Sequence, residues 1–509
     1  MRKNIALFIS CLLFTIAGNA QTKVFKEVSE EISSQVKAIT QDNALVGYLV
    51  FTKLEKVDED NFNYKITIMD ENLNDIGTVK FTEAAIDLQG VSFEQDILCL
   101  AYTKKDTHPN DKTKKKVKDK ETGDALSGFL KQKDELLIQF ISLEGKIINT
   151  YTTEISLSAT PYISGRGFSA KYVYYYGLKH GLQVRNIAKR GFAVYYGDQV
   201  RDAFMVFDTK GSLLWTKKLM MFGDYFYLHT SGSSIYILTK SNDLAPEGGY
   251  TLHTYSTNDT LAYFKYDLKD KKGDWLKVLT FDNDPTTGKA YLTGCIINPD
   301  KQKDYITARD YSNGPYLGLF TLNVGNTAKE MAGVYSYWNT NAIQGVSEEG
   351  LFTAPNDNFY VRYSTAFKDY EGNTVFAGSA VIEKKLLGIP KYKLADGVFI
   401  KQDAKAQVKL DNNVECDETS YFGPAGTIAE FDKKGFYKVT NNETKTNYII
   451  IDDDDNTFIY NVNAKKIMRT IQHKEGRIKT NVFPAKEGHV MISEYNKKEK
   501  YTRFSIEAL

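Results

Sequence analysis

The residues that could do acid–base or metal chemistry are scattered along this sequence and do not form a known motif. No two histidines have the H-E-x-x-H or H-x-H spacing that places two imidazoles on one metal ion. The sequence also lacks a G-x-S-x-G turn for a serine nucleophile and a Walker loop for phosphates. We therefore predict no catalytic residue, no metal site and no cofactor. The histidines are His108, His180, His229, His253, His473 and His489.

An acidic segment, "IIIDDDDNTFIY" (449–460), is the first of two candidate ligand sites. It carries four consecutive carboxylates, Asp452 to Asp455, and carboxylate oxygens are ligands that calcium prefers. The EF-hand spacing, with a Gly and a distant Glu, is absent. We therefore interpret the segment as an acidic hairpin turn, with a calcium loop as the alternative.

A tyrosine-rich segment, "KYVYYYGLKHG" (171–181), is the second candidate. Aromatic rings stack on the apolar faces of sugars while hydroxyl groups form hydrogen bonds, so the segment could line a glycan or peptide groove. A strand whose alternate tyrosines enter the core would have the same sequence, and we favour that interpretation. The residues concerned are Tyr172, Tyr174, Tyr175, Tyr176, Lys179 and His180.

A lysine-rich stretch, "KKDTHPNDKTKKKVKDKETGD" (104–124), opens a predicted loop insertion over 104–133. Such a cluster could contact polyanions, for example lipid phosphates or acidic glycans. Because Asp and Glu are mixed among the lysines, we favour a solvated loop. The whole chain has a net charge of +1, so nothing in its balance points to nucleic acid.

The first 20 residues have the layout of a secretory signal peptide. Arg2 and Lys3 precede an apolar run from Ile5 to Ile16, and Ala20 stands at the expected cleavage point. Twelve apolar residues are too few for a membrane span, which needs about 20. No later segment is apolar enough to cross a bilayer. We expect an exported protein, periplasmic or extracellular, with no transmembrane segment in the mature chain.

Cleavage would leave three cysteines, Cys99, Cys295 and Cys416, and we interpret them as small buried hydrophobes. The composition, with 34 Tyr, 29 Phe and only 10 Pro, favours β-structure. One segment, "VFKEVSEEISSQVKAI" (24–39), places apolar residues every four positions and predicts a short amphipathic helix. We assign it to an N-terminal leader over 21–43.

The rest of the chain, 44–509, repeats a unit of short strands. An apolar strand, then a polar turn, then a more amphipathic strand recurs eight times, and other strands precede each pair. The glycines Gly77, Gly145, Gly211 and Gly273 lie 68, 66 and 62 residues apart. We expect the apolar strands to be the third strands of four-stranded units; they span 63–70, 136–143, 203–208, 261–268, 317–323, 376–383, 458–462 and 501–509.

These third strands are apolar on both faces, as in "DAFMVFDTKGSLLWTKKLM" (202–220). A sheet buried on both faces at its centre and wetter at its outer edge suits a β-propeller, where each blade packs between two others. We predict an all-β propeller of about eight four-stranded blades, with seven blades or two β-sandwiches as alternatives. Asp208 and Gly211 would serve a turn, and Trp215 would pack between blades.

The last unit has no residues left for its outermost strand. A ring could borrow that strand from the N-terminal region, either "KVFKEV" or "ALVGYLVF", so that the termini close the ring. The first choice conflicts with the helix predicted over 24–39.

Hairpins such as "FMVFDTKGSLLWTKKL" resemble those of quinoprotein-type and related bacterial propellers, including periplasmic outer-membrane-assembly scaffolds. The Ala20–Gln21 cleavage site and the Tyr-, Asn- and Lys-rich body are similar to uncharacterised exported propellers of Bacteroidota. Quinoprotein propellers repeat a docking tryptophan in most blades. Because here only Trp215 and Trp275 occupy that kind of position, quinone binding is not implied.

Function is open among three classes. The first is a monomeric, non-enzymatic scaffold that binds a protein, peptide or glycan partner. The second is a propeller enzyme acting on envelope or extracellular polysaccharide, with its acid and base taken from separate blades. The third is a structural component of the envelope with no small ligand. Because fold does not supply function, the ligand-binding residues stay unknown at this level.

Overall fold

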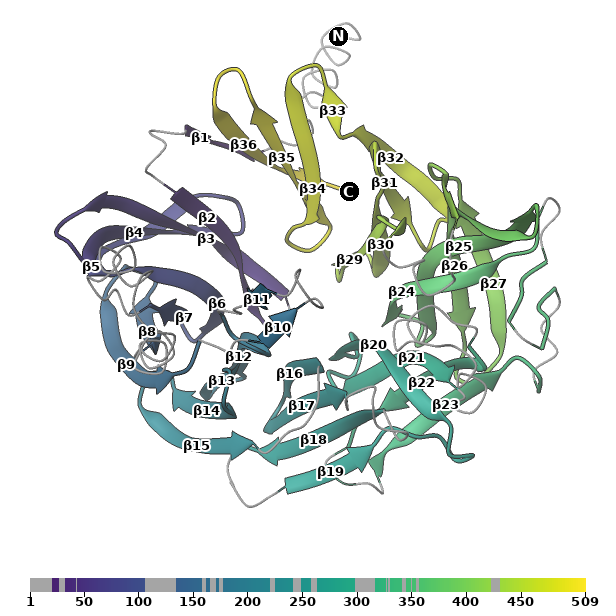
Figure 1. Cartoon of the computed structure of the whole chain (residues 1–509), viewed down its shortest axis with the longest axis horizontal. Helices are drawn as coiled ribbons and strands as arrows, with labels where there is room; N and C mark the ends of the chain where they lie inside the picture. The colour runs from purple at the N-terminus through teal and green to yellow at the C-terminus, as the bar shows by residue number, and fades with distance from the viewer. Residues whose placement is uncertain are drawn as a thin grey trace, which may run out of the picture.

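The strands of the protein form eight blades around a central axis, which confirms the all-β propeller and its higher blade number (Figure 1). Seven blades contain four consecutive strands, so neighbouring strands along the chain are neighbours in the sheet. The computed structural model describes residues 21–26, 33–42, 44–105, 134–157, 162–164, 171–173, 177–219, 225–240, 249–257, 263–297, 316–325, 327, 330–340, 345–348, 350–353, 357–422 and 431–509.

The first four blades follow one another in sequence order, and one additional hairpin lies between blades 2 and 3. Blade 1 is β2 (Ser33–Gln41), β3 (Ala44–Lys56), β4 (Asn61–Asp70) and β5 (Asp75–Ala84); blade 2 is β6 (Ile86–Glu94), β7 (Ile97–Lys104), β8 (Asp134–Ser142) and β9 (Ile147–Ile155). The hairpin β10 (Tyr162–Ser164) and β11 (Lys171–Val173) follows. Blade 3 is β12 (Gly181–Ile187), β13 (Gly191–Gly197), β14 (Asp202–Asp208) and β15 (Leu213–Leu219); blade 4 is β16 (Tyr225–Ser231), β17 (Ser234–Lys240), β18 (Tyr250–Ser256) and β19 (Tyr263–Asp267).

The last four blades complete the ring. Blade 5 is β20 (Trp275–Asn283), β21 (Ala290–Ile297), β22 (Gly318–Asn323) and β23 (Ala332–Tyr337); blade 6 is β24 (Tyr360–Lys368), β25 (Thr374–Leu386), β26 (Ile389–Gln402) and β27 (Val408–Val414), with β28 (Thr419–Phe422) paired to β26. Blade 7 is β29 (Gly435–Asn441), β30 (Thr446–Asp452), β31 (Asn456–Asn461) and β32 (Lys466–Gln472). Blade 8 holds β33 (Lys474–Glu475), β34 (Ile478–Pro484), β35 (His489–Asn496) and β36 (Tyr501–Ala508).

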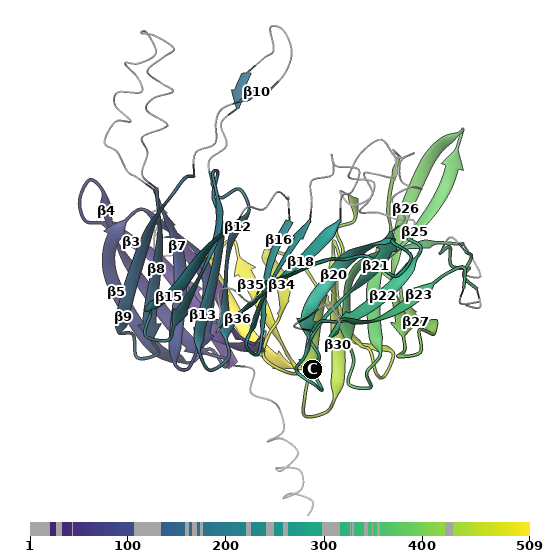
Figure 2. The ribbon, with the colours of Figure 1, turned by 90° about the horizontal axis from the view of Figure 1, so that it is seen from below.

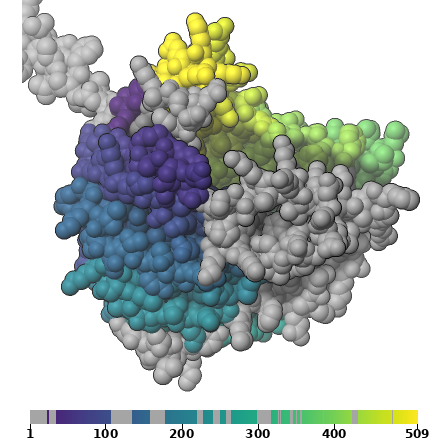
Figure 3. All heavy atoms as spheres, turned by 60° about the vertical axis from the view of Figure 1, so that its left-hand side comes forward, coloured from purple at the N-terminus to yellow at the C-terminus, as the bar shows by residue number. Residues whose placement is uncertain are grey.

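The N-terminal strand β1 (Gln21–Lys26) closes the ring. It pairs antiparallel with β36, from Gln21 opposite Ile506 to Lys26 opposite Tyr501, and so supplies the outermost strand of blade 8. The space-filling view shows purple N-terminal residues beside the yellow C-terminal blade (Figure 3). This confirms the closure predicted from "KVFKEV"; the alternative "ALVGYLVF" belongs to β3 of blade 1.

The helix predicted over 24–39 is wrong, because β1 and β2 occupy the described parts of that segment. The physical reason is that a four-residue spacing of apolar residues fits both a helix and a strand. Residues four apart share one face of a helix, but four is also an even number, so they share one face of a strand as well. Val24 lies in β1 and Val36 in β2.

Six of the eight predicted third strands lie next to the outermost strand of their blade, as third strands do, and two are displaced by one position. The segment 261–268 overlaps β19, the outermost strand of blade 4, and 376–383 lies in β25, the second strand of blade 6. The prediction chose the wrong strand in blade 4 because the third strand there, β18, reads "YTLHTYS" and alternates apolar with polar residues. The regular glycine spacing contains the same error. Gly273 lies between β19 and β20, which belong to different blades, and not between the third and fourth strands of one blade.

Blade 3 shows why the apolar third strands stack radially. Met205 and Phe207 pack with the core of blade 2, around Phe140, whereas Phe204 and Val206 pack toward blade 4. Trp215 packs on this second cluster, with its ring centroid 4.9 Å from that of Phe204, and thus lies between blades as predicted. Alternate residues of one strand therefore pack into two separate cores, one on each face of the blade.

The turn after β14 also has the predicted role. The Asp208 carboxylate accepts hydrogen bonds from the backbone N–H groups of Lys210 (2.9 Å) and Ser212 (2.8 Å). Gly211 has a φ of 78°, and its carbonyl accepts a hydrogen bond from the Asn149 side chain of blade 2 at 2.9 Å. The turn thus joins two blades as well as two strands.

We expect Gly211→Ala to lower the free energy of unfolding by about 2 kcal/mol, through left-handed backbone strain plus a collision between the new Cβ and the Phe140 ring. Gly273→Ala is the matched control, because Gly273 has a φ of 90° with nothing within 4 Å of an added Cβ. It should lose about 1 kcal/mol from strain alone. Urea unfolding measures both, and equal losses would contradict the inter-blade contact.

Cys99, Cys295 and Cys416 are buried, as predicted, and free. Cys99 and Cys295 lie on β7 and β21, and Cys416 follows β27. Burial raises the pKa of the Cys295 and Cys416 thiols to about 12, so these groups stay as neutral thiols at physiological pH.

Candidate functional site

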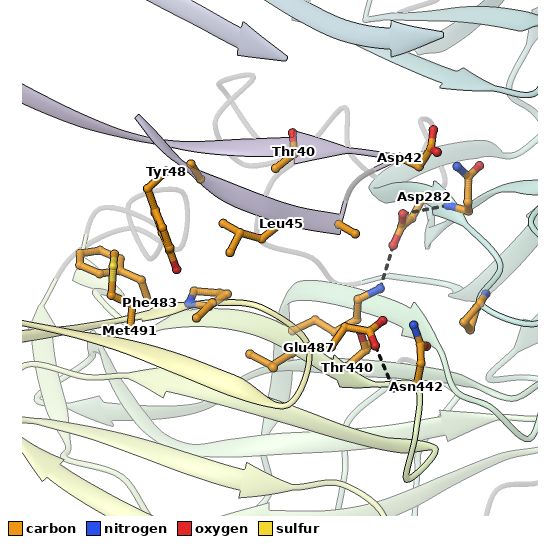
Figure 4. Close-up of a pocket in the computed structure, with 18 of the residues that line it drawn as sticks. Thr40, Asp42, Leu45, Tyr48, Asp282, Thr440, Asn442, Phe483, Glu487 and Met491 are labelled. Atoms are coloured by element: carbon orange, nitrogen blue, oxygen red, sulfur yellow. Dashed lines mark hydrogen bonds and ion pairs between the residues drawn. The ribbon is translucent and has the colours of Figure 1, made fainter. Parts of the chain in front are cut away.

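A pocket of about 1050 Å³ lies at one end of the central axis (Figure 4). Six of the eight blades contribute to it, mostly through their innermost strands and the turns that follow them, and blades 1 and 8 also through the strands beyond these. Its two walls differ in character. The residues used below are Val36, Thr40, Asp42, Leu45 and Tyr48 of blade 1, Asp282 and Asp284 of blade 5, Lys438, Thr440 and Asn442 of blade 7, and Phe483, Pro484, Ala485, Glu487, Met491 and Phe504 of blade 8.

One wall is polar and is held by an ion pair between blades 5 and 7. Asp282, at the end of β20, accepts a hydrogen bond from Lys438 Nζ of β29 at 2.8 Å. Burial alone would raise the pKa of Asp282, but the ammonium group of Lys438 and the backbone N–H of Asn283 hold it below its usual range. The carboxylate therefore stays ionised.

Asp284 is held in the same state two residues further on. Its carboxylate accepts hydrogen bonds from the N–H groups of Thr286 (2.9 Å) and Thr287 (3.0 Å) and from Lys368 Nζ of blade 6 (2.8 Å). These donors outweigh the effect of burial and hold the pKa of Asp284 well below its usual range. The wall thus presents fixed charges that are already paired.

The opposite wall is apolar and comes from blades 1 and 8. Figure 4 shows Phe483 and Met491 across the pocket from Asp282, with Leu45 and Tyr48 above them. Phe483 keeps 44% of its surface exposed, although it lies in a pocket built of hydrophobic neighbours. The buried Tyr48 hydroxyl has no hydrogen-bond partner among the described residues. The exposed surface of Phe483 leaves capacity for contacts with another molecule.

A buried polar network holds the lip of the pocket at blades 1, 2 and 3. The Asn186 side chain of β12 donates to Asp42 (2.8 Å) and to Glu94 of β6 (3.0 Å) and accepts from the Asp42 N–H (2.9 Å). Glu94 also accepts from Gln41 Nε2 (3.3 Å) and from the Lys189 N–H (2.9 Å). Glu94 is 1% exposed. Three blades are therefore fixed relative to one another beside Asp42.

Of the segments singled out from the sequence, the residues that the structure describes do not line this pocket. Asp452 ends β30, and Asp453–Asp455 form the hairpin turn between β30 and β31, as we favoured. Their side chains have separate partners: Asp452 lies 3.0 Å from His473 Nε2, and Asp453 accepts from the Asp417 N–H at 2.9 Å. Among the described residues, no three His, Cys, Asp or Glu side chains are grouped for a metal ion.

The tyrosine-rich segment is only partly described. Lys171–Val173 form β11, and Tyr174–Tyr176 lie outside the described residues, so the groove stays a prediction. His180 directly precedes blade 3 with its side chain 7% exposed, and its Nδ1 lies 2.8 Å from Asp202 Oδ1. Tyr195 donates to the same oxygen at 2.9 Å. Of the lysine-rich insertion, residues 106–133 also lie outside the described part.

One histidine borders the pocket. His229 of β16 is buried, and its Nε2 lies 3.1 Å from Oδ1 of Asn283, the neighbour of Asp282. Burial lowers the pKa of His229 to about 4, from a reference of 6.5, although the Asn283 hydrogen bond acts in the opposite direction. His229 is therefore neutral in the folded protein at pH 7.

The depressed pKa of His229 predicts acid destabilisation. Below pH 6.5 the unfolded chain protonates this imidazole and the folded chain does not, so stability is complete above pH 6.5 and falls as the pH drops toward 4. At pH 5 the loss from this residue should be about 2 kcal/mol. Urea unfolding at pH 7.5 and 5.0 measures it. If His229→Gln keeps the same pH dependence as the wild type, another group is responsible.

The comparisons with known proteins add to the fold and not to the site. A model of a family of unknown function (DUF6770) matches residues 1–123, less than half of the chain. No curated protein sequence matches. Among the described residues, no helix is long and apolar enough to cross a membrane.

Three solved structures are similar to this chain. The WD40 domain of SCAP from fission yeast is 9% identical over 95% of this chain and 98% of its own, with a TM-score of 0.40. The propeller of Dos1 is 8% identical over 95% and 94%, with a TM-score of 0.42. Apo AztD from Citrobacter koseri is 10% identical over 89% and 95%, with a TM-score of 0.37. Such values carry no information on function, and the blade count rests on the strand pairing. The chain is an all-β, eight-bladed propeller whose first 123 residues are similar to a family of unknown function.

Proposed function

We propose that this protein is an exported, non-enzymatic scaffold whose axial pocket binds a polypeptide segment of a partner protein. The observation that carries the proposal is the two-sided pocket: an apolar wall with a half-exposed Phe483 faces a wall of fixed charges headed by Asp282 and Lys438. Pockets that combine apolar area with a few placed polar groups are typical binding sites.

The charges on the pocket lining indicate the kind of segment. Asp282 is balanced by Lys438, and Asp284 by Lys368. Asp42 and Glu487 add negative charge at the lip, where Asp42 is hydrogen-bonded to the neutral amide of Asn186. A segment with apolar side chains next to a lysine or arginine would match both walls.

Two observations favour a peptide over a glycan or a polysaccharide substrate. The apolar wall contains Leu45, Pro484, Ala485 and Met491, which fit apolar side chains better than they stack on sugar rings. A glycosidase needs a carboxylic acid with a raised pKa, whereas the pKa values of Asp282 and Asp284 are both lowered.

Export rests on the sequence of residues 1–20, which lie outside the described part of the structure. We assign the mature protein to the periplasm or the cell exterior on that basis. N-terminal sequencing of the protein from fractionated cells tests this separately, with a mature terminus at Gln21 expected and an intact Met1 in the cytosol contradicting it.

Selection from a random peptide library on the immobilised mature protein tests the binding proposal, with a glycan array run on the same sample. We expect peptides rich in apolar residues with a nearby lysine or arginine. Their affinity should fall at least tenfold on the variant Leu45→Lys, which places a charge on the apolar wall. Ile148→Lys, at an exposed position on β9, is the matched control and should bind normally. Peptides that bind both variants equally, or hits on the glycan array alone, would overturn the assignment.

A further inference from the structure

The hairpin between β25 and β26 carries an apolar tip that extends past the neighbouring blades (Figure 2). These two strands have 13 and 14 residues, the longest in the molecule together with β3, and they pair as far as Leu386 opposite Ile389. Leu387 is 96% exposed, and Leu386 and Ile389 are each 54% exposed. Phe422 of the short strand β28 is exposed beside them, opposite Lys391 of β26. We call these four apolar residues the blade 6 tip.

The backbone conformation of the turn makes an apolar residue unexpected at position 387. Leu387 has a φ of 52° and Gly388 a φ of 80°, so both central residues of the turn are left-handed. Turns of this kind favour Asn, Asp or Gly at the first position, because a branched apolar side chain is strained there. Leu387 is therefore unfavourable both in its backbone and in its exposure to water. Departures of this kind are expected where function requires the side chain.

Lysines surround the base of the tip. Lys384 lies directly opposite Lys391 in the β25–β26 ladder, and like charges at such positions destabilise a hairpin. Lys391 Nζ lies 5.6 Å from the ring centroid of Phe422, and Lys384 pairs with Asp357 at 3.0 Å on an exposed surface. An apolar apex with cations immediately behind it has the layout of an interfacial membrane anchor.

The blade 6 tip points away from the axial pocket. β24 ends at Lys368, which is bonded to Asp284 of the pocket wall. β25 begins at Thr374, opposite Lys368, and runs back to Leu386, so the tip lies at the far end of the blade. A surface that held the tip would therefore leave the mouth of the pocket free for a partner.

We propose that the blade 6 tip docks the protein on the surface of a lipid bilayer that carries anionic headgroups. Leu386, Leu387, Ile389 and Phe422 enter the headgroup region, and Lys384 and Lys391 contact phosphates. A narrow, convex group of four side chains is small beside the roughly 800 Å² that each partner contributes to a stable protein interface. A bilayer requires no matching shape, and its negative charge complements the lysines.

Vesicle flotation of the mature protein tests the proposal, with vesicles of phosphatidylcholine alone and with 30% phosphatidylglycerol. We expect binding to the anionic vesicles and weaker binding to the neutral ones. The variant Leu386→Ser/Leu387→Asn/Ile389→Thr should lose at least tenfold in affinity, and since Asn suits the left-handed turn it should unfold no more easily than the wild type. Lys384→Gln/Lys391→Gln should lose about 25-fold at low salt, about fivefold for each lysine.

Val200→Asn is the matched control, because Val200 is 79% exposed on the loop between β13 and β14, away from the tip. It should float like the wild type. The proposal is overturned if the wild type floats with neither vesicle, if it binds both vesicles equally, or if the triple tip variant still floats normally. Binding of the tip to a protein in place of lipid would appear as the first of these outcomes.

Discussion

Replacing Gln21–Lys26 by a Gly–Ser sequence of equal length should lower the free energy of unfolding by about 3 kcal/mol. The replaced strand loses six cross-strand pairs with β36, each worth about 0.5 kcal/mol. Lys23 also forms an ion pair with Asp75 and donates to the Leu73 carbonyl at 3.4 Å, so β1 connects blade 8 to blade 1. Urea unfolding of the chain from Gln21 onward measures the loss.

Lys23→Gln is the control for this replacement, since it removes the exposed ion pair and keeps the strand. It should lose no more than about 1 kcal/mol. The replaced chain should also associate at high concentration, because β36 becomes an unpaired edge. If the Gly–Ser chain unfolds like the wild type and stays monomeric, β1 does not close the ring.

Asn186→Leu should cost about 3 kcal/mol, through the network that joins blades 1, 2 and 3. The substitution leaves the buried Glu94 carboxylate without one donor and Asp42 without its side-chain and main-chain partner. An unsatisfied buried polar group costs about 1–3 kcal/mol, and more when it is charged. Urea unfolding measures this loss too.

A double-mutant cycle separates this network from simple packing. Glu94→Leu should also be destabilising, because it removes the acceptor of one Asn186 side-chain N–H and of the Gln41 side chain. The double variant should lose less unfolding free energy than the sum of the two single losses, by more than about 1 kcal/mol. The reason is that neither the unpaired Glu94 carboxylate nor the unpaired Asn186 N–H is present in it. Additive losses would show that Asn186 and Glu94 act independently.

The fold could be predicted because the blade pattern repeats within short stretches of sequence. Phe204 and Val206 alternate with Met205 and Phe207, and each pair belongs to a different inter-blade core. This reveals a sheet buried on both faces before any long-range contact is known. The prediction failed where a local pattern fits two structures, as with Val24 and Val36, or where a third strand is half polar, as in β18.

The pocket could not be predicted because its chemistry is assembled from distant residues. Asp282 and Lys438 are 156 positions apart, and Glu94 and Asn186 are 92 apart. Neither pair lies in a segment of unusual composition, and "FDNDP" around Asp282 reads as an ordinary turn. The conspicuous segments, such as Asp452–Asp455, instead form turns whose side chains satisfy local partners. Closure of the ring, and no linear motif, brings the pocket residues together.

Site-specific photocrosslinking in living cells tests the central claim most directly. A photoreactive phenylalanine analogue at Phe483 lies on the exposed apolar wall of the pocket, and the same analogue at Ile148, which is 41% exposed on β9, serves as control. We predict a discrete adduct with one partner polypeptide from position 483 and none from position 148. No adduct at 483, or the same adducts at both positions, would contradict a partner-binding pocket on the propeller axis.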